Sequence, residues 1–217
     1  MNIDPQYISL ATKTWTPIHR DDPGHYISSI DIDILFGDEL EKIGEGKAYK
    51  VRVDHIINDG EWSLYDVFEG HSTDLYELYQ ELFADDDLIP DVEDELCDYG
   101  NIVLIKSIVM KPQYRSQGFG GILALAIAER FADQDIVALK PWPMTPDGPE
   151  NPAGVWELPR LTKTEQKSIA MKLRKSYMRA GFKPLLRGSN HLFLTHSRHP
   201  RVTQLIDKWN EERLTIG

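Results

Sequence analysis

Cysteine and basic residues are both scarce in this 217-residue chain. Cys97 is the only cysteine, which excludes an internal disulfide and a cysteine-rich zinc site, and we expect no metal site. The 24 Lys and Arg residues face 35 Asp and Glu, for a formal net charge of -11. Nucleic acid is therefore disfavoured as a partner, because phosphate backbones are bound by basic surfaces. A cationic substrate fits this excess of acidic residues better.

Long apolar runs are missing as well. No segment approaches the roughly 18 apolar residues that a membrane helix needs. The first residues, MNIDPQYISL, lack the basic and apolar regions of a signal peptide. We therefore expect a cytoplasmic protein without a membrane partner, either a monomer or a homodimer.

What is present is the composition of a globular protein, with 41% apolar and 27% charged residues. The length suffices for a substantial core, so we assign residues 1–217 to a single domain. Residues 1–27 show no clear period, and we expect an irregular segment there, or one that includes a short strand. A helical extension is expected over 198–217, opened by Pro200.

Periodicity predicts the elements of the first half. SIDIDILF (29–36) and KAYKVRVDHII (47–57) alternate polar and apolar residues, which indicates an antiparallel hairpin. Asp74 followed by Glu77 resembles a capping box and predicts a helix over 74–84. The next segment, 85–98, has eight acids and no base, which indicates an exposed segment.

The second half contains a βαβ pattern. A nearly continuous apolar run over 101–110 predicts a buried strand, followed by a glycine turn, a helix over 120–132 and a parallel strand over 136–140. The next stretch, 141–161, holds six prolines and is expected to be a loop. Thr162 and Glu165 then form a capping box.

The capping box predicts a helix that Gly181 ends. Two short apolar segments, 182–186 and 191–196, read as a last hairpin.

The glycine turn is the most informative feature. Three of the four residues 118–121 are glycine. The free N–H groups and the dipole at a helix N-terminus bind phosphates, and glycines let a ligand approach. The segment is not a P-loop, because no Gly-Lys-Ser/Thr follows, and not a dinucleotide fingerprint, because position 123 is Leu. A phosphate site and a tight strand-to-helix connection remain alternatives on these residues alone.

Two motifs together carry a family resemblance. Residues 115–120, RSQGFG, match Arg/Gln-x-x-Gly-x-Gly/Ala, and the run IVMKPQYRSQGFGGILA (108–124) resembles the cofactor motif of the GNAT superfamily of N-acetyltransferases. SYMRAGFKPL (176–185) resembles that family's Tyr-x-x-x-Gly-Phe segment. Met110 and Ser116 replace the motif's Val and Gly, changes that we expect to matter little.

The resemblance implies a fold and a cofactor. The fold is α/β (α+β), with a mixed, mostly antiparallel twisted sheet that is splayed between two parallel strands and flanked by helices. The co-substrate is acetyl-CoA. Its pyrophosphate is expected on the N–H groups of the turn, which are those of Ser116, Gln117, Gly118, Phe119, Gly120 and Gly121. Arg115 would either support the phosphates or brace the turn.

The same resemblance implies main-chain contacts along the strand. The pantetheine arm is expected to pair with Ile108 and Met110, as an added strand does. An N–H near Val109 would polarise the thioester carbonyl.

Tyr177 is implied as the general acid that protonates the leaving thiolate. The alternative is that it only completes the apolar helix face of Ile169 and Leu173. Ala170 stands where many family members carry an asparagine. The general base is left open: Glu93 is the named candidate, and the further candidates are Asp94, Glu95, His191 and His196.

These features predict an N-acetyltransferase that moves an acetyl group from acetyl-CoA to a primary amine by direct attack. The acceptor is expected to be a small cationic amine or an exposed protein amine, steered by the acids of 85–98. A non-catalytic acyl-CoA-binding module is the alternative function. Transfer of a longer acyl chain is a weaker one.

Overall fold

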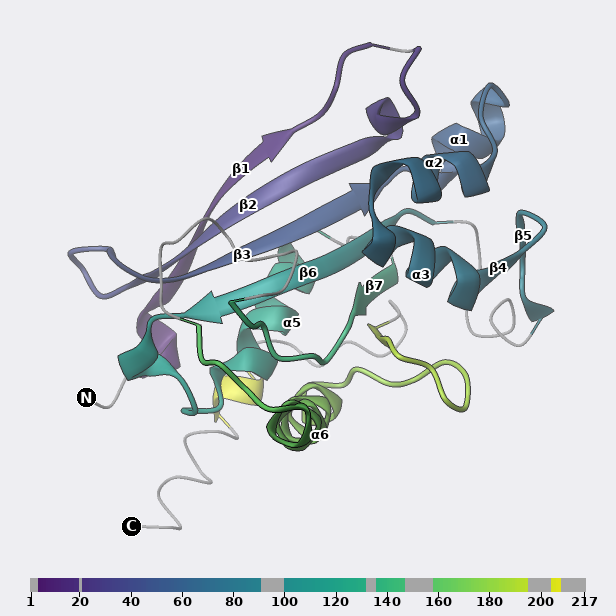
Figure 1. Ribbon diagram of the computed structural model, residues 1–217. Coiled ribbons are helices and arrows are strands. Elements are labelled where there is room, and N and C mark those ends of the chain that lie inside the picture. Colours follow the sequence, from purple (N-terminus) through teal and green to yellow (C-terminus); the bar gives the residue numbers. More distant parts are fainter. Residues whose placement is uncertain are drawn as a thin grey trace.

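The computed structural model describes residues 4–19, 21–90, 100–131, 136–146, 158–194 and 204–207. Its centre is a six-stranded sheet in the order β1-β2-β3-β6-β7-β8 (Figure 1). All neighbouring strands are antiparallel except β6 and β7, which are parallel. The prediction of a mixed, mostly antiparallel sheet with helices is confirmed.

The first three strands form an antiparallel meander: β1 Ile8–Trp15, β2 Ile27–Phe36 and β3 Glu41–Val51. The predicted hairpin is confirmed, and its turn places Gly37 and Leu40 in left-handed backbone conformations. Of the two alternatives for 1–27, the segment that includes a strand is correct, because β1 pairs with β2 along its whole length. Two short 3-10 helices flank β1, η1 Pro5–Tyr7 and η2 Pro23–Tyr26.

Three helices follow β3: α1 Val53–Asp59, α2 Leu64–His71 and α3 Thr73–Leu82. The strand predicted over 47–57 is therefore correct only as far as Val51. The helix predicted over 74–84 is confirmed as α3, but its N-cap is Ser72, whose hydroxyl accepts the N–H of Leu75 at 3.3 Å. The short helix α2 has no counterpart among the sequence predictions.

A small hairpin closes this region, with β4 Phe83–Ala84 paired to β5 Asp87–Leu88. Asp86 in its turn accepts hydrogen bonds from the Tyr65 N–H at 3.0 Å and from the Tyr79 hydroxyl at 2.9 Å. This carboxylate thus ties α2, α3 and the turn together. Most of the acidic stretch, from Asp91 onward, lies outside the described residues.

The predicted βαβ unit is confirmed as β6 Ile102–Met110, α5 Phe119–Phe131 and β7 Ile136–Leu139, with η3 Pro112–Tyr114 before α5. The two strands differ in length. Ile102–Ile105 of β6 pair with β7, and Lys106–Met110 run on beyond its last residue, Leu139.

The C-terminal elements are α6 Lys163–Arg179 and β8 Leu192–Leu194. The capping box is confirmed, with Thr162 and Glu165 bonded to each other's backbone. Gly181 follows the helix with a φ of +99°. The last hairpin is correct only in part, because Lys183 alone bridges to Phe193; Pro184 has no N–H to extend the ladder. Of the extension predicted over 198–217, only 204–207 are described, and they are helical.

The core lies on both faces of the sheet. Tyr49, Leu104 and Ala138 face a cluster formed with α1, α2 and α3, and the alternate residues Val103 and Ile105 face a cluster with α5 and α6. Figure 1 shows α3 in front of β6 and β7, and α5 behind them. Alternation of side chains along buried strands produces this division. Among the described helices, none is long and apolar enough to span a bilayer.

Candidate functional site

An irregularity in β6 coincides with the point where β7 ends. Lys47 of β3 pairs with Ser107, whereas its neighbour Ala48 pairs with Ile105. Lys106 is therefore an extra residue, a β-bulge. Because pairing with β7 stops at Ile105, the bulge marks the start of the part of β6 that extends past its parallel neighbour.

The alternation of the ladder decides which main-chain groups face the edge beyond β7. The N–H of Lys111 donates to the carbonyl of Ile43 on β3 at 2.9 Å. Main-chain N–H and C=O groups alternate in direction along a strand. The groups of Val109 therefore also face β3, and those of Ile108 and Met110 face away from it. The Met110 carbonyl fits this direction, because it accepts from Arg115 Nε at 2.8 Å. An N–H aimed outward here thus belongs to Ile108 or Met110.

The turn after β6 has an unusual backbone. Ser116 has a φ of +61° and Gly118 a φ of +87°, whereas Gln117 between them has no positive φ. Left-handed residues next to residues of negative φ can turn successive N–H groups to one side, as in anion-binding nests. The turn leads directly into α5, whose first turn, described throughout, carries no acidic residue. The local geometry thus fits an anion.

Arg115 stabilises this turn with one of its nitrogen donors, while another has no acceptor among the described residues. Its Nε holds the Met110 carbonyl, while Nη2 is buried without a hydrogen-bonding partner in the described part of the chain. Burial lowers the pKa of the guanidinium, although arginine remains charged at neutral pH. A buried charged donor without an acceptor is costly unless something else binds it.

Tyr177 and the glycine turn meet in space. A Cβ built on Gly120 would lie 3.7 Å from the Tyr177 hydroxyl oxygen, and one on Gly121 would lie 3.0 Å from the Ser176 carbonyl oxygen. Glycine at 121 therefore allows the close approach of α5 and α6, and the Tyr177 hydroxyl lies against the first turn of α5. The two sequence motifs are thus in contact.

Burial governs the acidity of Tyr177. The side chain is 9% exposed, and desolvation raises its pKa to about 12. The phenol is neutral and keeps its proton throughout the physiological range. It packs edge-to-face on Phe182, with ring centroids 6.2 Å apart, so it is also part of the core, as the alternative interpretation has it.

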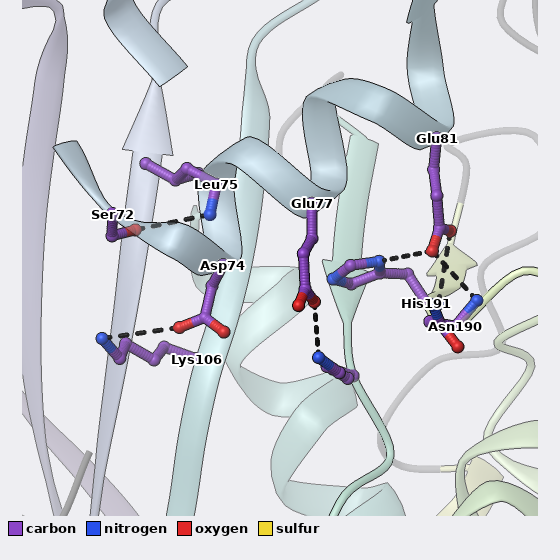
Figure 2. Close-up of polar contacts among 9 residues, drawn as sticks. Ser72, Asp74, Leu75, Glu77, Glu81, Lys106, Asn190 and His191 are labelled. Carbon is purple, nitrogen blue, oxygen red and sulfur yellow. Dashed lines mark hydrogen bonds and ion pairs between the residues drawn. The ribbon is translucent and has the colours of Figure 1, made fainter. Parts of the chain in front are cut away.

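A row of acids on α3 was not recognised as a feature by sequence reasoning. Asp74 lies 3.5 Å from Lys106 Nζ, Glu77 pairs with Lys140, and Glu81 contacts His191 (Figure 2). These spacings of three and four residues place the acids on one helix face. The row connects α3 to β6, to the residue after β7 and to the residue before β8.

Glu81 has the densest contacts of the three. Its carboxylate accepts from the Ser189 hydroxyl, from the Asn190 N–H at 2.9 Å and from the His191 N–H at 3.3 Å, and it lies 3.1 Å from His191 Nδ1. Burial opposes ionisation, but the contacts with His191, Ser189 and Asn190 lower the pKa of Glu81 to about 2. His191 itself is 0% exposed, so it does not face an external substrate.

The named base candidate, Glu93, lies outside the described residues, as do Asp94, Glu95 and His196. Ile108, Met110 and the residues 115–121 gather at one end of β6, and Tyr177 joins them from α6. Comparisons with protein-family models, with curated proteins and with solved structures found no match.

Proposed function

We propose that this protein is an acetyl-CoA-dependent N-acetyltransferase of the GNAT type. The observation that carries the proposal is the contact of Tyr177 with Gly120. Two motifs, each identified separately and far apart in the sequence, meet at the N-terminus of α5. A purely structural glycine turn would not require a tyrosine hydroxyl at that point.

The residues at this end of β6 fit the groups of acetyl-CoA. The nest formed by Ser116–Gly118 and the first turn of α5 offer N–H groups to a pyrophosphate. The buried Nη2 of Arg115 is a further donor that has no acceptor among the described residues. The outward main chain of Ile108 and Met110, beyond the end of β7, suits an amide-containing arm that adds as a strand.

The reaction is a direct acyl transfer. The neutral amine nitrogen forms a bond to the carbonyl carbon, the carbon–sulfur bond breaks, and the sulfur leaves with the electron pair as a thiolate. The nitrogen loses one proton to solvent, which gives the neutral amide. Tyr177, with a pKa of about 12, is a weaker acid than a thiol of pKa about 8.5. It therefore stabilises the leaving sulfur chiefly as a hydrogen-bond donor. An N–H of Ile108 or Met110 would polarise the carbonyl.

A non-catalytic acyl-CoA-binding module is the second candidate. Ala170, on α6, has a methyl side chain and cannot supply the polar contact to the cofactor arm that an asparagine would give. The two functions share the donor site and differ only in turnover. They are therefore separated by measuring binding and catalysis on the same protein.

The test combines CoA binding by calorimetry with thiol release from acetyl-CoA over an amine panel. Tyr177→Phe should lower turnover at least about tenfold while leaving acetyl-CoA affinity little changed. Tyr114→Phe is the matched control. That tyrosine is also buried and precedes the same turn, but its hydroxyl lies 3.4 Å from Glu41 Oε2. It should retain wild-type turnover.

Each outcome has a distinct meaning. Binding of CoA without product across the panel would support the binding module. Absence of CoA binding would refute both functions. Wild-type turnover in Tyr177→Phe would leave the transferase intact and assign Tyr177 to the core alone.

A further inference from the structure

Two lysines converge on one tyrosine at the β6 bulge. The ammonium groups of Lys47 and Lys106 lie 5.6 Å and 5.4 Å from the centroid of the Tyr49 ring. Tyr49 is 6% exposed, and the His71 ring meets it edge-on at 4.8 Å. The four side chains come from β3, β6 and the end of α2, and they share the sheet face that α3 covers.

The two lysines differ in their partners. Lys106 forms an ion pair with Asp74 at 3.5 Å, which Figure 2 shows at the start of α3. For Lys47, the ring of Tyr49 is the contact seen, and no carboxylate of the described residues lies within ion-pair distance. Although Asp31 is directly opposite Lys47 on β2, the Lys47 ammonium contacts the Tyr49 ring and forms no ion pair with a carboxylate of the described residues. Ser107, directly opposite Lys47 in the ladder, adds a hydroxyl on the neighbouring strand.

The pKa of His71 is influenced by the same two lysines. Burial, together with the charges of Lys106 and Lys47, lowers the pKa of His71, and Asp22 only partly opposes this. His71 is thus neutral at physiological pH and leaves the lysines as the cations of this group. Two lysine charges therefore lie at the Tyr49 ring, and Asp74 pairs with one of them.

This cationic group lies next to the proposed reaction centre. Ser107 precedes Ile108, whose main chain faces the edge where the proposed thioester would lie. The two lysines, on β3 and β6, occupy the α3 face of the sheet, whereas Tyr177 belongs to the α5 and α6 face. An amine that enters from the lysine side would therefore reach the proposed thioester from the face of the sheet opposite Tyr177.

We propose that the acceptor amine carries an anionic group, a carboxylate or a phosphate, which Lys47 binds while the amine meets the thioester. This inference rests on the proposed N-acetyltransferase activity and narrows its substrate class. It differs from the sequence expectation of a small cationic amine or an exposed protein amine. The nearby positive charge also favours the neutral amine, which is the reactive form.

The test uses acceptors matched in amine and side chain. Thiol release from acetyl-CoA is measured with single amino acids against their carboxamides, and with O-phosphoethanolamine against ethanolamine. The anionic member of at least one series should be preferred by about ten- to a hundredfold in kcat/KM, as expected for a charged hydrogen bond. The series that shows the preference identifies the anion.

Lys47→Met should raise KM for the anionic acceptor by a similar factor and leave the neutral analogue unchanged. Lys47→Glu should reverse the preference. Lys13→Met is the matched control, because Lys13 is an exposed lysine on β1, two strands from β3. Thermal unfolding of each variant confirms that it is folded.

The results separate this inference from the proposed function. Turnover of neutral or cationic amines with no anionic preference, or an anionic preference that survives Lys47→Met, would overturn the acceptor assignment and leave the transferase standing. No turnover of any acceptor by a protein that binds CoA would contradict the transferase itself, and the acceptor assignment with it.

Discussion

Replacing Glu81 with glutamine should destabilise the protein more than any other single charge removal on α3. The carboxylate receives hydrogen bonds from Ser189, Asn190 and His191, and its side chain is 17% exposed. Glutamine keeps the shape but places an N–H₂ group among these donors. The contacts that join α3 to the start of β8 would be lost or reversed.

The magnitude follows from the acidity of Glu81. Its pKa falls from an ordinary 4.5 to about 2, a difference that corresponds to roughly 3 kcal/mol of stability at pH 7. Because the folded-state pKa is the lower one, this contribution is fully present above about pH 4.5. It decreases as the pH falls towards 2, and about 2 kcal/mol remains at pH 3.5.

Denaturant unfolding from pH 7 to pH 3.5 measures this effect. Glu77→Gln is the matched control, four residues earlier on the same helix. Its pair with Lys140 is more open, with side chains 36% and 35% exposed, and is expected to contribute at most about 1 kcal/mol. Equal losses in the two variants would refute the reasoning. So would a Glu81→Gln deficit that stays constant as the pH falls.

Two further predictions concern the glycine turn. Ser116 has a φ of +61°, so Ser116→Gly should relieve a strained backbone and raise Tm by about 2 to 4 °C, allowing for the greater entropy of glycine in the unfolded chain. A lower Tm would show that the serine hydroxyl stabilises the turn. Gly121→Val should cost about 1 to 3 kcal/mol in unfolding free energy, because even its Cβ would lie 3.0 Å from the Ser176 carbonyl oxygen. Gly120→Ala, with ordinary contacts of 3.7 Å, should be neutral or slightly stabilising, and equal effects of the two substitutions would contradict the packing argument.

Strands with strong alternation could be predicted from the sequence, and weakly patterned ones could not. Ile30, Ile32 and Ile34 alternate with polar residues, and all three are buried. In β1 the alternation involves Ser, Ala and Thr, whose hydrophobic contrast is small. Pairing with β2 then decides the structure, since an edge strand gains a full ladder from its neighbour.

The end of β3 shows how two periods can compete. Val51 and Val53 continue the alternation of the strand, which favours extension to residue 57. Val53 and Ile56 are also three residues apart, as on a helix face, and both are buried. Gly60, with a φ of +64°, provides the C-terminal stop of α1. A short helix with few apolar residues gives too weak a helical period to outweigh the preceding alternation.

The donor half of the candidate site was accessible from the sequence, because it depends on consecutive residues. The pairing of Lys47 with Lys106 was not, because it depends on register. Leu104 is paired with Tyr49 and shares its face, so alternation along β6 puts Lys106 on that face as well, and the bulge brings Ser107 opposite Lys47. The residue types around Lys106 do not indicate a bulge.

Two of the three glycines of the turn have structural causes, and the two causes differ. Gly118 supplies a left-handed φ of +87°, which few other residues adopt at low cost. Gly121 lets α6 approach within 3.0 Å of where a Cβ would be, and Gly120 faces the Tyr177 hydroxyl across an ordinary contact. Ligand approach therefore explains neither Gly121 nor the backbone strain at Ser116 by itself. The case for a bound anion depends instead on the alternation of φ over Ser116–Gly118 and on the buried Nη2 of Arg115, two features that helix packing alone does not require.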